Sequence, residues 1–160
     1  MSDPVAVGQP APHFALDASS GESVSLKEHF GKGPTVLLFV PLAFTPVCTN
    51  ELKMMRDDYD YYTSRGARVL GASVDSQYTL KVWADQLKLP FPLLSDFNKE
   101  TAAAYGALYE ELGGLRGVAK RAAFVIDKDG IIRFRWVSED ASVLPPFDDI
   151  KATVQETAST

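Results

Sequence analysis

The chain has 160 residues, of which 46% are hydrophobic and 23% charged, so it can bury a core without disulfides or a structural metal. Its net charge of −5 argues against nucleic acid and anionic membranes as main partners, because both usually bind basic surfaces. The longest apolar run, Val36 to Val40, is too short to cross a bilayer, and Met1 to Pro4 show no signal-peptide pattern.

The cysteine and histidine counts narrow the chemistry further. One cysteine excludes an intramolecular disulfide and favours the reducing cytoplasm as location. Two histidines and the absence of a paired-cysteine motif leave no standard zinc site, so we expect no metal and no cofactor.

The first part of the chain predicts a hairpin, a buried strand and a helix. Alternating apolar residues around the turn at 17–21 predict an N-terminal β-hairpin. The continuous apolar run 35–40 is typical of a strand covered on both faces. A single helix is predicted over 46–64, ended by Gly66.

Strands and helices continue to alternate in the second part. We expect strands at 68–74 and 91–94, helices at 76–87 and 99–105, a hairpin of strands 122–126 and 131–137, and a last helix from about 146 to 157. No repeat or linker interrupts this order, so we expect one domain over residues 1–160. The order predicts an α/β protein with a thioredoxin-like fold: a mixed central sheet flanked by helices, with an N-terminal β-hairpin.

Cys48 is the main candidate for chemistry, because it follows the central strand at the start of a helix. Sites in open α/β sheets form beyond the carboxyl ends of strands. Thr45 is a suitable N-cap and Pro46 suits the first helical position, which puts Cys48 third. Free backbone N–H groups and the helix dipole there favour a thiolate, which is a nucleophile.

An inert, buried cysteine is the competing interpretation. Cys48, Leu52, Met55, Tyr59 and Tyr62 follow one another at helical spacing and form a stripe that faces the core. Free cysteines are often buried in this way. The stripe therefore predicts a thiol at the inner edge of a pocket rather than on the open surface.

The motif Pro41-x-x-x-Thr45-x-x-Cys48 resembles the active-site motif of peroxiredoxins. Glu51 stands three residues after the cysteine, and Arg121 directly precedes an apolar strand, as in that family. Segments 7–14 and 91–96 also resemble the family, so the similarity covers nearly the whole chain. The stretch from Pro41 to Thr45 looks most like the one-cysteine AhpE-type subfamily.

The resemblance implies a catalytic role for five side chains. Cys48 is the peroxidatic nucleophile, Thr45 positions the peroxide, and Pro41 shields the site from water. Arg121 stabilises the thiolate and polarises the O–O bond, and Glu51 orients an arginine. Independently, a fixed guanidinium suits the negative charge that develops on the departing oxygen.

Substrate contacts follow from the same resemblance. Val47 and Phe44 are the expected substrate-binding residues, with backbone N–H groups near Val47 and Cys48 holding the peroxide oxygen. Arg116 is a less favoured alternative to Arg121. Hydrogen peroxide, an organic hydroperoxide and peroxynitrite all remain open as substrates.

The chain has no second cysteine to resolve the sulfenic acid, and Lys53 holds the place where some relatives carry one. Recycling therefore needs an external thiol or a thioredoxin- or glutaredoxin-like reductant, through a mixed disulfide. The resemblance also implies a homodimer.

Three alternatives to this thiol-dependent peroxidase stay open at this point. A glutathione-peroxidase-like enzyme fits the motif spacing less well. A redox sensor or adaptor would form mixed disulfides through Cys48 with little turnover. A binding domain on the same scaffold would leave the thiol unactivated, since a fold does not fix a function.

Overall fold

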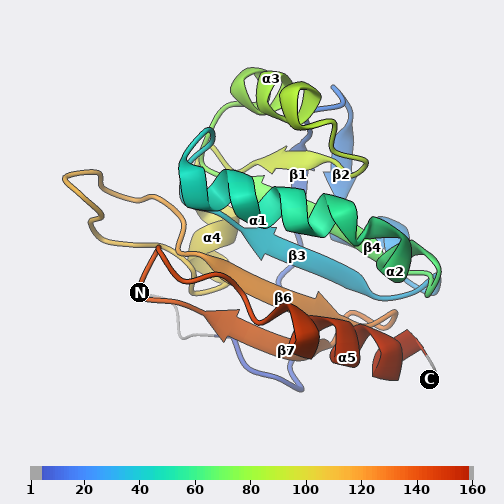
Figure 1. The fold of residues 1–160 in the computed structure, drawn as a ribbon. Coiled ribbons are helices and arrows are strands. Elements are labelled where there is room, and N and C mark those ends of the chain that lie inside the picture. Colours follow the sequence, from blue (N-terminus) through green and yellow to red (C-terminus); the bar gives the residue numbers. More distant parts are fainter. Residues whose placement is uncertain (1–4, 159–160) are drawn as a thin grey trace.

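A five-stranded sheet runs through the centre of the protein, with helices against both faces, in the computed structural model of residues 5–158 (Figure 1). The strand order is β5-β4-β3-β6-β7. The start at residues 1–4, where we expect no signal peptide, lies outside the described residues. The strands are β3 (Thr35–Phe39), β4 (Arg68–Ser73), β5 (Leu93–Ser95), β6 (Ala122–Ile126) and β7 (Ile132–Val137).

The sheet is mixed, as the order of elements predicts. Strands β3, β4 and β5 are parallel, whereas β6 runs antiparallel to β3 and β7 antiparallel to β6. The N-terminal hairpin of β1 (Ala15–Asp17) and β2 (Ser23–Ser25) forms a separate two-stranded ladder. The predicted α/β architecture with a thioredoxin-like sheet and an N-terminal hairpin is thus confirmed.

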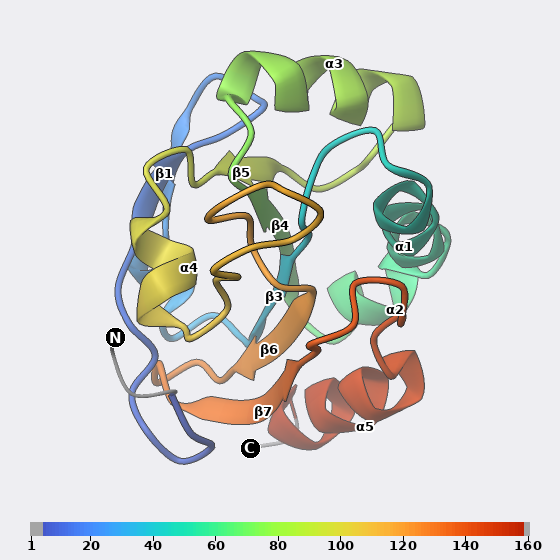
Figure 2. The same cartoon turned by 90° about the vertical axis from the view of Figure 1, so that its left-hand side faces the viewer.

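The helices divide between the two faces of the sheet. Figure 2 shows α4 and β1 on one side of the sheet and α1, α2 and α5 on the other. Within residues 5–158, no helix has the length and apolar character needed to cross a bilayer. The helices are η1 (Leu26–His29), α1 (Pro46–Asp57), α2 (Tyr59–Thr63), α3 (Gln77–Leu87), α4 (Glu100–Ala104) and α5 (Phe147–Ala158).

Strand β3 is buried along its whole length because both of its faces are covered. Val36 and Leu38 belong to the core cluster that includes residues of α1, α3 and α5. Leu37 and Phe39 belong to the cluster formed with α4 and the N-terminal hairpin. Successive side chains therefore enter opposite cores, which explains why the run is apolar without alternation.

The prediction of a single helix over 46–64 is wrong in one respect, because the helix is interrupted at Asp58. Asp58 leaves helical geometry, with φ −100° and ψ 11°, and the N–H of Tyr61 bonds its carbonyl in a tighter turn. The Asp58 carboxylate forms an ion pair with Lys151 of α5 at 2.8 Å. The break turns α2 toward α5, so that the hydroxyl of Tyr61 donates to the carbonyl of Lys151.

The short strand predicted at 91–94 lies two residues later, as β5. Pro92 explains the shift, because it has no N–H to donate to a ladder; its carbonyl accepts from Gly71 instead. The following helix, α4, begins after Asp96, whose buried carboxylate accepts the N–H groups of Thr101 at 3.1 Å and Ala102 at 2.7 Å. The short helix η1 was not predicted, and the remaining elements lie within about a residue of their predicted bounds.

Candidate active site

Cys48 lies in the first turn of α1, directly beyond the carboxyl end of β3 and the loop from Pro41 to Thr45. Its side chain is fully buried and belongs to the same cluster as Leu52 and Met55. The predicted core-facing stripe is therefore present, and the thiol lies inside the protein rather than on its surface.

Arg121 reaches Cys48 because β6 is antiparallel to β3. The end of β3, at Phe39, pairs with the start of β6, at Ala122, so the residue before β6 lies at the same edge of the sheet as the residues after β3. The Arg121 Nη2 group donates to the Cys48 Sγ atom at 3.3 Å. The expected pairing of these two side chains is thus present in the structure.

Two further acceptors fix the Arg121 guanidinium. Its Nη1 group donates to Glu51 Oε1 at 3.1 Å, and its Nε group donates to the carbonyl of Ala141 at 2.9 Å. The arginine side chain is only 2% exposed. Burial alone would lower the pKa of Arg121, but Cys48 and Glu51 outweigh it and raise that pKa, so the group remains a cation.

Glu51 is a fully buried carboxyl group one helical turn after Cys48. Burial raises its pKa to about 7, although the charge and hydrogen bond of Arg121 act in the opposite direction. Its second oxygen, Oε2, has no hydrogen-bond partner among residues 5–158. Glu51 therefore orients Arg121 through one oxygen only, at a desolvation cost to the ionised form.

Thr45 occupies the N-cap position of α1, but its side chain does not cap the helix. The hydroxyl instead donates to the carbonyl of Leu42 at 2.8 Å. The expectation of a side-chain cap is wrong: in the orientation that bonds Leu42, the hydroxyl oxygen accepts none of the first helical N–H groups. As a result the first helical N–H groups, at Val47 and Cys48, have no protein acceptor among the described residues.

The remaining predicted site residues lie in the loop before α1. Pro41 is buried and Val47 is half-buried. Phe44 is 47% exposed and has a φ of 66°, a left-handed conformation unusual for a residue other than glycine. Its ring lies 5.9 Å from that of Trp83, whose indole N–H donates to Thr49 Oγ1 at 3.2 Å.

The sequence interpretation missed one residue that touches this loop. Asp75 follows β4, and its Oδ2 atom accepts the backbone N–H of Ala43 at 2.8 Å. The available signal was its place after a strand adjacent to β3, since the ends of parallel strands share one edge of the sheet. Its carboxylate had no motif to mark it.

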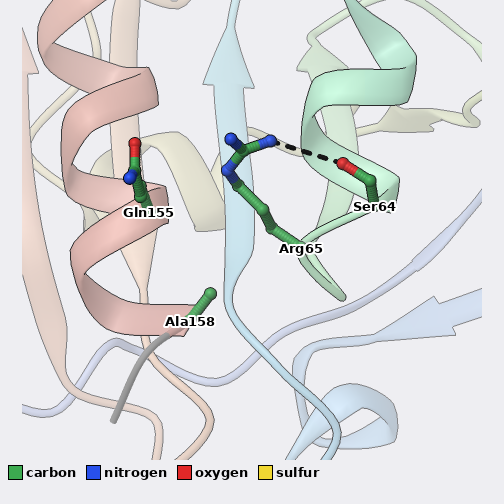
Figure 3. A pocket seen from close by; sticks show the side chains of 4 residues that line it. All are labelled: Ser64, Arg65, Gln155 and Ala158. Atoms are coloured by element: carbon green, nitrogen blue, oxygen red, sulfur yellow. Dashed lines mark hydrogen bonds between the residues drawn. The ribbon is translucent and has the colours of Figure 1, made fainter.

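Other candidates lie away from Cys48. Arg116 is exposed and has no hydrogen bond to the thiol among the described residues, whereas Arg121 has one. A surface pocket lined by Ser64, Arg65, Gln155 and Ala158 lies between the end of α2 and α5 (Figure 3). It carries no nucleophilic thiol, and it lies beyond the opposite end of α1 from Cys48.

The arrangement supports attack by a thiolate on a small electrophile. A buried guanidinium donates to the sulfur atom, and the first turn of the helix that carries the cysteine has two N–H groups without a protein acceptor among the described residues. The same donors suit an oxygen that gains charge when a bond to it breaks. Fold and site together define a thiol-dependent enzyme.

Comparisons with known proteins agree with this conclusion. Residues 7–135 match the AhpC/TSA family. Alkyl hydroperoxide reductase E of Mycobacterium tuberculosis is 37% identical over 139 residues, which cover 86% of this chain and 88% of that protein. Chloroplastic peroxiredoxin Q of Triticum aestivum is 37% identical over 130 residues, 81% of this chain and 58% of that protein.

Solved structures show the same fold. The crystal structure of peroxidoxin BcpB from Mycobacterium tuberculosis has a TM-score of 0.83 and 32% identity, covering 94% of this chain and 96% of that one. Mycobacterium bovis AhpC has a TM-score of 0.84 and 29% identity, covering 96% and 92%.

These similarities make the protein a thiol-dependent peroxidase. The chain belongs to the AhpC/TSA family of peroxiredoxins, and its single cysteine is that of the one-cysteine type. The comparisons do not favour the redox sensor as the alternative.

Proposed function

We propose that Cys48 is the peroxidatic residue and that Arg121, Thr45 and the first turn of α1 form its peroxide subsite. The observation that carries this proposal is the 3.3 Å contact between Arg121 Nη2 and Cys48 Sγ inside a buried site. Arg121 stays charged and is held by Glu51 and the carbonyl of Ala141, so it is aimed before substrate arrives.

The Cys48 thiolate attacks the terminal oxygen of the hydroperoxide. A sulfur–oxygen bond forms and the O–O bond breaks, which oxidises the sulfur and reduces the peroxide. The alkoxide or hydroxide leaves with the electron pair and takes a proton, giving an alcohol or water and a sulfenic acid on Cys48. Arg121 and the N–H groups of Val47 and Cys48 stabilise the charge that builds up on the oxygens.

The loop residues prepare this subsite. Thr45 has one hydroxyl proton, which it already donates to Leu42, so its oxygen has lone pairs to accept a hydrogen bond from the peroxide O–H. Buried Pro41 presents an apolar ring and no N–H, which limits the access of water. Phe44 offers a half-exposed ring to the organic part of a substrate.

An external thiol completes the cycle. The first thiol attacks the sulfenic sulfur, forms a mixed disulfide with Cys48 and releases water. A second thiol attacks that disulfide and returns Cys48 to the reduced state. Since the chain has one cysteine, both equivalents come from a low-molecular-weight thiol or a thioredoxin- or glutaredoxin-like protein.

We propose organic hydroperoxides as the substrate class. A relative 37% identical to this chain is named alkyl hydroperoxide reductase E, and the exposed Phe44 ring supports the same substrate class here. We also propose a cytoplasmic location, supported by the bacterial relative and by the single free cysteine. The homodimer and the single domain over residues 1–160 remain proposals that follow from the family resemblance and from the order of elements.

Stopped-flow fluorescence on the reduced protein tests the proposal. We expect rapid oxidation by cumene hydroperoxide and hydrogen peroxide, absent in Cys48→Ser and much slower in Arg121→Ala. Addition of a thiol should then support repeated turnover, whereas a sensor would react once and stop. Oxidation of the unmodified protein no faster than that of an ordinary exposed cysteine would refute the peroxidatic assignment.

A further inference from the structure

The loop from Pro41 to Thr45 has an unusual backbone for a segment that must hold a substrate in place. Phe44 has a φ of 66°, and a residue with a side chain in that region is disfavoured by about 1–2 kcal/mol. Such a conformation persists only where the surroundings determine it. The loop must therefore be held by specific contacts.

Asp75 provides the contact directly before the strained residue. The N–H of Ala43 donates to Asp75 Oδ2 at 2.8 Å, which links the loop to the end of β4. A hydrogen bond to a charged acceptor is stronger than one between neutral groups. On the other side of Phe44, the Thr45 hydroxyl bonds the carbonyl of Leu42, so the loop is closed on itself there.

Asp75 is itself anchored to two strands. The Ser73 hydroxyl donates to the same Asp75 Oδ2 atom at 2.8 Å, and the Asp75 N–H donates to Ser73 Oγ at 3.2 Å. The Ser95 hydroxyl, from β5, donates to the Asp75 carbonyl at 2.7 Å. Ser73 is 1% exposed, so the anchor is part of the rigid sheet.

We propose that Asp75 is a positioning residue for the peroxide subsite, acting through the N–H of Ala43 on Thr45 and Pro41. The inference rests on the proposed function, in which those two residues meet the peroxide. The hydrogen bonds of Asp75 among the described residues go to Ala43, Ser73 and Ser95 and not to Cys48 or Arg121. Asp75 therefore sets the place of the substrate and leaves the reactivity of the thiolate to Arg121 and α1.

Two reactions of the same thiol separate these effects. Oxidation by a peroxide needs the loop, whereas alkylation by iodoacetamide needs the thiolate but not the peroxide subsite. In Asp75→Ala we expect peroxide oxidation to slow by about 10-fold to 100-fold, since small misplacements of a bound reactant have effects of this size. Alkylation should not fall, and the midpoint of its pH profile should be unchanged.

Asp75→Asn is the rescuing variant. Both the Ala43 N–H and the Ser73 hydroxyl bond the same oxygen, and one amide oxygen in that place accepts both. We therefore expect Asp75→Asn to react with peroxide within about threefold of the unmodified protein, because the amide oxygen can hold the loop in the same place even though each hydrogen bond to it is weaker. Asp85→Ala controls for loss of charge, because it removes a carboxylate at an exposed ion pair with Lys81.

Ser73→Ala keeps the test decisive if Asp75→Ala does not fold. It loosens the carboxylate without removing it, and should slow peroxide oxidation by about 2-fold to 10-fold with alkylation unchanged. Wild-type oxidation rates in folded Asp75→Ala and Ser73→Ala would overturn this inference and leave the proposed function standing. A parallel fall in alkylation, or no rescue by Asp75→Asn, would also overturn it. Slow oxidation of the unmodified protein would overturn the proposed function as well.

Discussion

Replacement of Glu51 by glutamine should change how stability depends on pH. Glu51 is fully buried, and burial raises its pKa from 4.5 to about 7. Glutamine has nearly the same shape, and its side-chain oxygen can accept from Arg121 Nη1 as the carboxylate does, but it does not titrate. The Glu51→Gln variant therefore removes one titration while it keeps the hydrogen bond.

The raised pKa fixes the sign and size of the effect. Between the unfolded and folded pKa values the folded protein binds more protons than the unfolded chain, so the free energy of unfolding falls as pH rises. The contribution of Glu51 is full below pH 4.5 and is lost as pH rises through about 7, a total of about 3 kcal/mol. About 2 kcal/mol of this contribution is lost between about pH 5.5 and 8, a range above the sequence pI of about 5.0.

Urea unfolding under reducing conditions at several pH values measures this contribution. From about pH 5.5 to 8, the unmodified protein should lose about 2 kcal/mol of unfolding free energy relative to Glu51→Gln. Glu156→Gln, the same change at an exposed position of α5, is the control for the loss of one carboxyl group. A difference for Glu51→Gln that does not vary with pH would refute the burial argument.

Three other substitutions give distinct results. Arg121→Ala should slow the oxidation of Cys48 by about 10²-fold to 10³-fold in stopped flow, and a rate near wild type would contradict the role of Arg121 in the site. The same variant should lower the free energy of unfolding in urea by about 3–5 kcal/mol, because Glu51 loses its ion-pair partner. Leu52→Ala, in the core beside Cys48, should cost about 2–5 kcal/mol by the same measurement, and a value below this range would mean that the core collapses around the cavity. Asp96→Ala should lower the free energy of unfolding by about 1–3 kcal/mol, because two buried N–H groups at the start of α4 lose their acceptor. Faster hydrogen exchange at Thr101 and Ala102 would show that the loss is there, and unchanged exchange would argue against this explanation.

Most of the fold could be predicted because its signals are local. The apolar run of β3 and the Thr45-Pro46 start of α1 lie within a few residues of the structure they specify. The placement of Cys48 in the first turn follows from that start alone. The expectation that the chain forms one domain over residues 1–160 stays a prediction.

The misplaced details depend on contacts between distant segments. The break at Asp58 reflects an ion pair with Lys151, nearly a hundred residues later, and no helical pattern in 46–64 contains it. Thr45 is at the N-cap position that the sequence predicts, but the path of the loop orients its hydroxyl toward the carbonyl of Leu42.

The contacts around the thiol required both kinds of information. Family resemblance paired Arg121 with Cys48, which the structure places 3.3 Å apart. No sequence signal pointed to the carbonyl of Ala141, because any residue can offer one. Asp75 was missed for a related reason. Its carboxylate accepts a backbone N–H, which every residue except proline has, so no particular residue type in the sequence marks its partner.

The pairing of β3 with β6 makes peroxide reactivity a probe of correct folding. Arg121 reaches the sulfur only if Phe39 pairs with Ala122. A slip of one residue would move the arginine by about 3.3 Å and turn it to the other face of the sheet. A refolded sample with the wrong register would still titrate as one thiol per chain, yet it would react slowly with peroxide. The ratio of fast-reacting to total thiol therefore measures the fraction of molecules whose central strands are correctly aligned.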